Sequence, residues 1–445
     1  MVTNPFGPYS EKIPDRWMTL MFGSQFVSLF LIPIMVYSDG KLSKEKQCKQ
    51  NSDHQKGQTK DIVSTKSLDG LRGLASLIVG IYHLLAYVQS PVNVSGQVAI
   101  PVFYVISGFA LELRYGKSFA SGSIKFNTFV RYIVRRFAKL YPAFFVLNVL
   151  SIPNFARHSE INLFMIPSFL LISQWVPSRR QFLPPKFASW TNSVLFFLYI
   201  TFPFLTYGLG VLNKKQAGQY SKSSVQLLAI VASLVYFLGG WIASVHGWQD
   251  AYYNSGPFAV PCFLAGCCAG HERMQQSCSK SSEVIQDFSQ GHCKSECSMS
   301  DAFLAIILTL CLTPILSPKN ALVASFAAQL PVYACILALT RPCAKPGFID
   351  SWILCSPAMQ FMSEISMCFY LLVPFLQDYV LWVHGGSSVM CALHVLVFIL
   401  AFPAAWIFTR FFEKPFYFAI VKWIDKVMEG LEKPFCADAP YHLLS

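Results

Sequence analysis

Apolar segments of membrane-spanning length recur along most of the chain, and this recurrence limits the possible fold more than any other feature. A helix needs about 20 apolar residues to cross the hydrocarbon core of a bilayer, because each residue adds only about 1.5 Å. Of the 445 residues, 54% are hydrophobic and 13% are charged, whereas about 25% charged is typical of a soluble domain. We therefore expect an all-α, polytopic bundle of about 10–12 transmembrane helices without a separate soluble module.

The expected spans lie at about 17–37, 70–90, 97–113, 137–152, 161–176, 190–211, 225–245, 257–271, 302–317, 321–340, 361–382 and 390–412. Three of them are short, so one is open to a re-entrant interpretation. No small-residue cleavage site follows the first span, which is therefore expected to stay as an anchor. We expect residues 1–66 to hold this anchor and a polar linker, residues 67–416 the transmembrane domain, and residues 417–445 a short tail.

The net charge of +12 indicates membrane topology rather than nucleic-acid binding. Seven Lys and Arg and no acid lie within residues 114–139, and three lie within residues 177–189, again without an acid. Both segments fall on one side of the membrane if the four spans between residues 70 and 176 each cross once. Lys and Arg collect on the cytosolic side, so we assign that side to the cytosol. Arg72 then lies at the cytosolic end of its span.

One span carries two ionisable residues, Arg72 and His83, between Leu68 and Val88. Ionisable groups inside the hydrocarbon are costly, so their default interpretation is functional. His83 lies eleven positions after Arg72, and a step of eleven positions returns a helix to within about 20° of its starting direction. Both side chains therefore share a face, about 16 Å apart along the axis. The alternative is a snorkelling arginine and a histidine hydrogen-bonded inside the bundle.

The 14 cysteines favour neither a metal site nor a disulfide framework, because most are single residues in apolar spans. One expected polar loop, 271–301, does gather potential ligands, but their spacing matches no common zinc site, so we expect no metal. A disulfide is the alternative if this loop is lumenal. The potential ligands are His271, Cys278, His292, Cys293 and Cys297. The single N-glycosylation sequon, at Asn93, lies in a short non-cytosolic loop close to the membrane.

Five motifs follow one another from residue 68 to residue 416. They are LDGLRGLASLIVGIYH (68–83), PVFYVISGFAL (101–111), RRFAKLYP (135–142), SEISMCFYLLVP (363–374) and FEKPF (412–416). In these motifs and their order the chain resembles the acyltransferase 3 family of integral-membrane acyltransferases. The first motif is similar to the family's hallmark of Arg, ten residues and His, and the second to its F-F-x-[IL]-S-G-F segment. In its apolar, Trp- and Cys-rich composition the chain looks most like fungal members.

The resemblance implies acyl transfer and a catalytic pair, His83 and Arg72. Neutral histidine is the usual base near pH 7, and it suits the removal of a proton from an acceptor hydroxyl. Asp69 precedes Arg72 by three residues, so we expect an ion pair that orients the arginine. Glu112 is expected to pack inside the bundle, and Glu364 to pair with a basic group.

The resemblance also implies acyl-CoA as co-substrate, with no permanently bound cofactor. Arg135, Arg136 and Lys139 are expected at the cytosolic surface, where a guanidinium fork suits phosphate. Ser107 is expected to donate a hydrogen bond near the acyl carbonyl. The alternative for the three cations is a positive-inside cluster, and for Ser107-Gly108 a small pair that lets helices pack closely.

Three positions depart from the family pattern. Lys139 stands where Arg is frequent, Leu195 where an acid is usual, and Val373 where His is frequent. Lysine keeps the charge of arginine but not its bidentate geometry. The two lost polar groups put in doubt any mechanism that depends on them, but they leave Arg72 and His83 intact.

We therefore expect an O-acyltransferase that moves an acyl group, first of all acetyl, from acyl-CoA to a hydroxyl of a small-molecule acceptor, with a secondary metabolite as the preferred class. A glycan or lipid O-acetyltransferase is one alternative, and a non-catalytic membrane transporter or binding relative is another. The expected partners are acyl-CoA, the acceptor and the lipid bilayer, with no nucleic acid. The expected location is the endoplasmic reticulum or another endomembrane.

Overall fold

The computed structural model describes residues 65–90, 94–120, 126–157, 166–176, 190–215, 221–280, 299–316, 321–340, 347–384 and 390–432. Within these ranges every regular element is a helix, which confirms the expected all-α class. The expected span at 17–37 and residues 281–298 of the expected polar loop lie outside the described residues.

The helices differ widely in length, and two of them are short π-helical segments. In chain order they are α2 (Lys66–Tyr87), α3 (Gly96–Ala120), α4 (Phe126–Arg157), α5 (Ile166–Phe169), α6 (Trp190–Lys215), α7 (Ser221–Val245), α8 (Gln249–Tyr253), α9 (Gly256–Lys280), α10 (Met299–Leu316), α11 (Ala321–Ala327), α12 (Gln329–Leu339), η4 (Asp350–Leu354), α13 (Pro357–His384), α14 (Met390–Phe408), η5 (Thr409–Glu413) and α15 (Lys414–Glu432).

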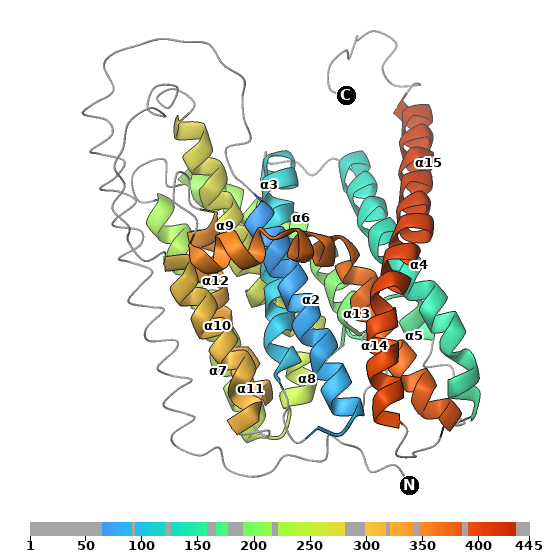
Figure 1. Cartoon of the computed structure of the whole chain (residues 1–445). Helices are drawn as coiled ribbons and strands as arrows, with labels where there is room; N and C mark the ends of the chain where they lie inside the picture. Colours follow the sequence, from blue (N-terminus) through green and yellow to red (C-terminus); the bar gives the residue numbers. More distant parts are fainter. Residues whose placement is uncertain are drawn as a thin grey trace.

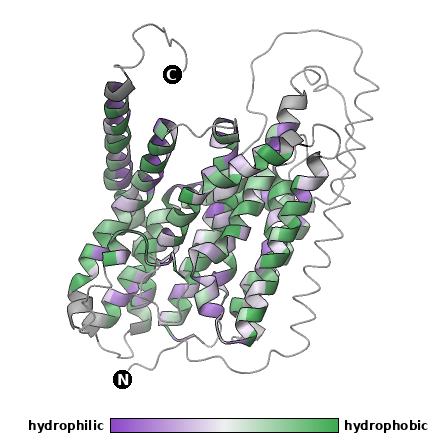
Figure 2. Ribbon diagram, turned by 180° about the vertical axis from the view of Figure 1, so that it is seen from behind, coloured by the Kyte–Doolittle hydropathy of each residue, from purple (hydrophilic) through white to green (hydrophobic). Residues whose placement is uncertain are grey.

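Six helical stretches in the described part of the chain are long and apolar enough to cross a membrane. They are Lys66–Tyr87, Gly96–Ala120, Trp190–Leu212, Ser223–Val245, Pro357–Leu381 and Cys391–Glu429. Their outward faces are apolar as well, which a soluble protein would avoid over so large an area. On α7 the exposed apolar side chains are Leu227, Val231, Val235, Leu238 and Ile242. Figure 2 shows hydrophobic residues along most of the length of the helices, as expected for an integral membrane protein.

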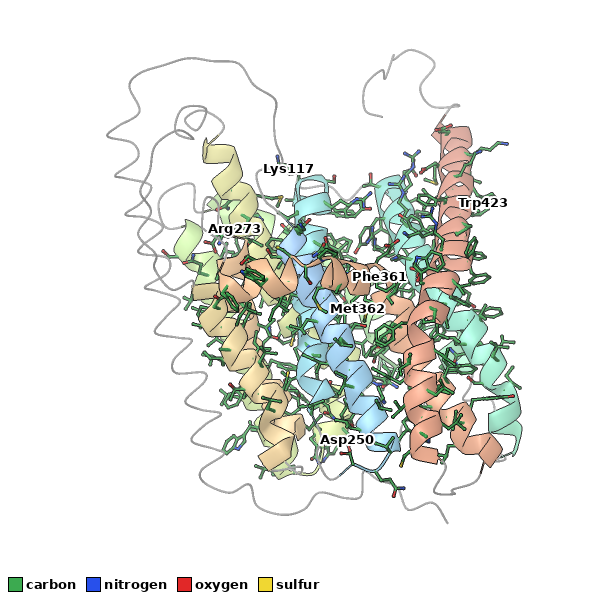
Figure 3. The ribbon with its side chains drawn as sticks, in the orientation of Figure 1. Lys117, Asp250, Arg273, Phe361, Met362 and Trp423 are labelled. Carbon is green, nitrogen blue, oxygen red and sulfur yellow. The ribbon has the colours of Figure 1, made fainter. Side chains whose placement is uncertain are left out.

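The bundle has two ends, which we name after Lys117 and Asp250 (Figure 3). α2 runs from the Lys117 end to the Asp250 end, and α3 returns, because Gly96 at the start of α3 lies against the ring of Tyr82. Both helices stand in the middle of the bundle in Figure 1, with α7 and α9 to α12 on one side and α4, α14 and α15 on the other. α2 packs most extensively against α13 and α3, and α3 against α9.

The last three elements form one long helix. The helical stretch from Cys391 to Glu429 is continuous over 39 residues, which corresponds to about 58 Å. The hydrocarbon core is only about 30 Å thick, so α15 extends beyond it at the Lys117 end, beside the start of α4 (Figure 1). The segment 417–445, expected to be a tail, is therefore helical as far as Glu432.

The expected span at 161–176 is wrong. Residues 166–176 hold only the short helix α5 and turns, and Gln174 is hydrogen-bonded to Ser193 near the start of α6. That start lies at the Asp250 end, because Trp190 packs against Tyr253 of α8. The described residues on either side of 177–189 therefore lie at the Asp250 end, opposite the end of α3, whereas residues 114–139 and 177–189 were expected on one side.

We predict that Gly73→Ala destabilises the bundle while Gly208→Ala does not. A Cβ at Gly73 would press on the backbone of α13, at the carbonyl of Met359 and at 2.9 Å from the nitrogen of Ser363. Overpacking of this kind costs about 1–3 kcal/mol. A Cβ at Gly208 meets nothing within 4 Å, so alanine there gains up to about 1 kcal/mol of helix propensity. Thermal unfolding of both purified variants in detergent measures the difference, and equal midpoints would contradict the close approach of α2 and α13.

Candidate active site

Arg72 lies at the Lys117 end of α2, and its guanidinium reaches across to α13. Nε donates a hydrogen bond to Oγ of Ser363 at 3.1 Å, and Nη2 donates to the same oxygen at 2.7 Å. Oδ1 of Asp69 lies 3.3 Å from Nη2, which confirms the expected ion pair. The arginine side chain is 40% exposed, so it lies at an open edge of the helix pair rather than in the core.

Further polar contacts join α2 to α13 along the length of both helices. Oγ of Ser76 donates to the carbonyl oxygen of Ser366 at 3.2 Å. The hydroxyl of Tyr87 donates to Oδ1 of Asp378 near the Asp250 end. Because the contacts advance in the same direction on both helices, α2 and α13 run parallel and in register. We call this row of contacts, with that of Arg72, the α2–α13 seam.

His83 lies between the serine and tyrosine contacts of this seam and is partly buried. Among the described residues its imidazole makes no hydrogen bond, and its one ring contact is with Tyr82, at 5.2 Å between centroids. Gly80 of α2 lies against Phe369 of α13. Since the two helices run parallel, His83 is level with the turn of α13 that follows Phe369. That turn includes the apolar Val373, which offers the imidazole no polar partner.

Ser107 lies on α3, one turn from Phe103. The ring of Phe103 packs against Tyr370 of α13, at 6.2 Å between centroids. Residues four apart share a helix face, so Ser107 is on the side of α3 that faces α13, about 6 Å nearer the Lys117 end. Within the described residues its side chain makes no hydrogen bond. The structure thus places Ser107 on the side of α3 toward α13, the helix whose Ser363 binds Arg72.

Arg135 and Lys139 lie one turn apart on α4, and both bind carboxylates of the C-terminal helices. Nη2 of Arg135 donates to the two carboxylate oxygens of Asp425 at 2.9 Å each. Nζ of Lys139 donates to Oε1 of Glu413 at 2.6 Å, and the thiol of Cys368 donates to its Oε2 at 2.9 Å. Glu413 is 2% exposed, so Lys139 compensates a buried charge. Two of the cations expected to hold phosphate are therefore already paired.

Arg136 points away from these two residues, toward α3. It donates to the hydroxyl of Tyr115 at 3.1 Å, and its guanidinium carbon lies 5.3 Å from the centre of that ring. The three expected cations of α4 thus do not converge on one point. Glu364 binds Lys414, which confirms the expected pairing with a basic group.

Glu112 packs inside the bundle as expected, but the sequence did not predict its hydrogen-bond partners. Glu112 of α3 is fully buried and accepts hydrogen bonds from Thr206 of α6 at 2.6 Å and from Nδ1 of His271 at 3.0 Å. The expected loop start at residue 271 is therefore wrong, because His271 lies within α9. Arg273, two residues on, is also buried and donates to Thr340 at 3.1 Å (Figure 3). These side chains fasten α9 to α3 and to the end of α12, and they fasten α3 to α6.

The remaining expectations concern the altered positions and the metal. Leu195 stands where the family pattern usually has an acid, and Val373 where it frequently has His. Both side chains are buried among apolar side chains. In the part of the chain that the structure describes, no group of three or more His, Cys, Asp and Glu side chains could hold a metal ion. His292, Cys293, Cys297 and the sequon asparagine Asn93 lie outside the described residues.

Residues 65–282 match the family model described as an acyltransferase domain, that of the acyltransferase 3 family. The chain is 29% identical to acyltransferase MdmB of Streptomyces mycarofaciens over 159 residues, 32% of this chain and 39% of that protein. It is 36% identical to protein 2 in the picA locus of Rhizobium radiobacter over 78 residues, 17% of this chain and 38% of that protein. The chain thus spans about two fifths of the length of these curated relatives. No solved structure matches it.

We predict that Lys139→Met destabilises the protein more than Lys414→Met does. The first change leaves the buried carboxylate of Glu413 without its cation, which costs about 2 kcal/mol or more after allowance for the half-exposed lysine. The partner of Lys414, Glu364, is 43% exposed, so water replaces the lost lysine at a cost below about 1 kcal/mol. Chemical unfolding of the two variants in detergent gives both values. Equal losses would mean that Glu413 is better solvated than its exposure indicates.

Proposed function

Residues 65–282 belong to the acyltransferase 3 family, and from that membership we propose that this chain is a membrane O-acyltransferase. It would transfer an acyl group, first of all acetyl, from acyl-CoA to a hydroxyl of a small-molecule acceptor. The observation that carries the proposal is the α2–α13 seam. There an arginine held by a serine shares one face of one helix with a histidine that has no hydrogen-bond partner among the described residues.

The chemistry assigns one step to each residue. Nitrogen of neutral His83 takes the proton of the acceptor hydroxyl as its oxygen attacks the thioester carbonyl of the donor. The new ester bond forms, the carbon–sulfur bond breaks, and the leaving thiolate receives the proton from the imidazolium. Arg72, about 16 Å away along α2, holds phosphate of the same donor, since the pantetheine arm of acyl-CoA is long enough to join the two points. Atoms and charge balance without a metal or redox partner.

The open imidazole supports this role for His83. A histidine that only stabilises a helix bundle would be expected to form hydrogen bonds through its imidazole, because a polar group buried in hydrocarbon is costly without a partner. In the described residues the seam satisfies Ser76 and Tyr87 but not His83. The imidazole is therefore available to an acceptor hydroxyl.

Two classes of acceptor are compatible with the proposed reaction. A secondary metabolite is our first candidate, and a glycan or lipid with a free hydroxyl is the alternative. A transporter or binding relative without chemistry would use the same seam only to recognise its ligand. Formation of an acylated product separates the enzyme from both.

The proposed orientation places the Lys117 end in the cytosol, where acyl-CoA is found. α6 ends and α7 begins there, because Gly210 near the end of α6 lies against Ala120 at the end of α3. Lys214, Lys215 and Lys222, which sit at these helix ends in the sequence, thereby add to the cytosolic excess of basic residues. The endoplasmic reticulum or another endomembrane is the proposed location, with Asn93 on the lumenal side as a candidate glycosylation site.

We predict that His83→Ala abolishes acyl transfer while the protein stays folded. The purified chain is incubated with acetyl-CoA and a panel of hydroxyl-bearing amphiphiles, free CoA is measured by its thiol, and products are searched for an added acetyl group. We expect a loss of at least about 100-fold. His246→Ala, a change at an exposed histidine outside the α2–α13 seam, is the matched control. Wild-type turnover in His83→Ala would remove His83 as the base, and no product from the wild-type protein would count against acyltransferase function.

We predict that Ser118→Cys and His246→Cys are labelled from opposite sides of a sealed vesicle. Both positions are exposed, the first at the Lys117 end and the second near Asp250. In a background without reactive native thiols, an impermeant maleimide should reach Ser118→Cys in vesicles with the cytosolic face outward, and His246→Cys only after permeabilisation. Labelling in the reverse order would invert the orientation, and Arg72 would then face away from cytosolic acyl-CoA.

A further inference from the structure

The cations near the Lys117 end differ in how firmly acids already hold them. Arg135 binds both oxygens of Asp425 at 2.9 Å, and Lys139 binds the buried Glu413 at 2.6 Å. Arg72 has as its one carboxylate partner Asp69, at 3.3 Å, and that side chain is 42% exposed. A longer ion pair in contact with water is weak. Arg72 therefore keeps more of its charge available to an incoming anion than its neighbours do.

A neutral hydroxyl, not a carboxylate, supplies the close contacts of Arg72. Oγ of Ser363 accepts from Nε at 3.1 Å and from Nη2 at 2.7 Å, and the carbonyl oxygen of Ser363 lies 3.4 Å from Nη2. Hydrogen bonds from a charged donor are strong and directional. They fix the plane of the guanidinium along its Nε–Nη2 edge without neutralising it.

One nitrogen of the Arg72 guanidinium is available to a ligand. Nη1 of Arg72 has no hydrogen-bond partner among the described residues, and this nitrogen is not fully buried. An unrestrained arginine loses about 2 kcal/mol of side-chain entropy when a ligand orders it. A guanidinium that is already held avoids part of this cost, so its affinity for phosphate rises.

We propose that Ser363 is a positioning residue that holds Arg72 with Nη1 directed at a phosphate of the acyl donor. The inference rests on the proposed function, and it adds a residue of α13 to a site that the sequence places on α2. It also makes Arg72 the main phosphate contact, since Arg135 and Lys139 must first release their carboxylates. Ser363 lies at the start of the SEISMCFYLLVP motif and lies 291 residues from Arg72 in the sequence.

The test compares Ser363→Ala with Ser363→Thr and Ser366→Ala in the full-length protein. Ser366 is the matched control, because it is a buried serine of the same helix whose hydroxyl donates to the carbonyl oxygen of Ser363 and does not touch Arg72. Binding of CoA is measured by calorimetry in detergent, and the KM for acetyl-CoA and kcat are measured by thiol release. Thermal unfolding of each variant is measured in parallel.

We expect Ser363→Ala to weaken CoA binding and raise the KM for acetyl-CoA about 10-fold, with kcat within about 3-fold, the size of one or two charge-assisted hydrogen bonds. Ser363→Thr, which keeps the hydroxyl, should bind within about 3-fold of the wild type, and Ser366→Ala should match the wild type. In an Arg72→Lys background Ser363→Ala should add little, because the two changes remove one interaction.

Other results overturn the inference. Unchanged CoA affinity and KM in Ser363→Ala, even with a lower unfolding midpoint, would make Ser363 a packing residue and leave the proposed function standing. Equal losses in Ser363→Ala and Ser366→Ala would point to a general disturbance of α13. A wild-type protein that neither binds CoA nor forms product would overturn the proposed function together with the inference.

Discussion

The structure depends on one constraint, that a polar side chain inside a membrane must find its partner within the protein. Lipid offers no hydrogen bonds, and an uncompensated charge in hydrocarbon costs several kcal/mol. The bundle meets this constraint at Glu112, which Thr206 and His271 bind from two other helices. It meets it again at Glu413, bound by a lysine and a thiol. Within the described residues His83 makes no hydrogen bond, and neither do the buried hydroxyls of Tyr104 and Tyr333. Of these groups His83 is the base, and it lies on the same helix as Arg72.

The same constraint explains why α2 and α13 are joined so closely. Serine and tyrosine hydroxyls on α2 reach α13 at several levels, and small residues on α2 allow the backbones to approach. Gly73 is such a position, since a side chain there would press on the backbone near Met359 and Ser363. Close packing fixes the register of α2 against α13, and this register is what places Ser363 beside Arg72.

Much of the fold can be predicted from the sequence, because lipid requires each membrane-spanning helix by itself to be long and apolar. Length and apolarity predicted the spans at 70–90, 97–113 and 190–211, and helices occupy all three. The ion pair of Asp69 with Arg72 was also predictable, since both partners lie on one helix turn. The error at 161–176 has a physical cause. A short apolar segment satisfies the same composition rule whether it crosses the membrane or packs at one end of a bundle.

The sequence by itself determined the all-α membrane class, the helix that carries Arg72 and His83, and the face that these two residues share, because these follow from composition and from the 3.6-residue repeat of a single helix. Only the tertiary structure decided that Ser363 holds Arg72, that Asp425 and Glu413 hold Arg135 and Lys139, and that His83 makes no hydrogen bond within the described residues. These contacts join helices far apart in the chain. Which helix faces which depends on the packing of all of them together, and no local pattern records it.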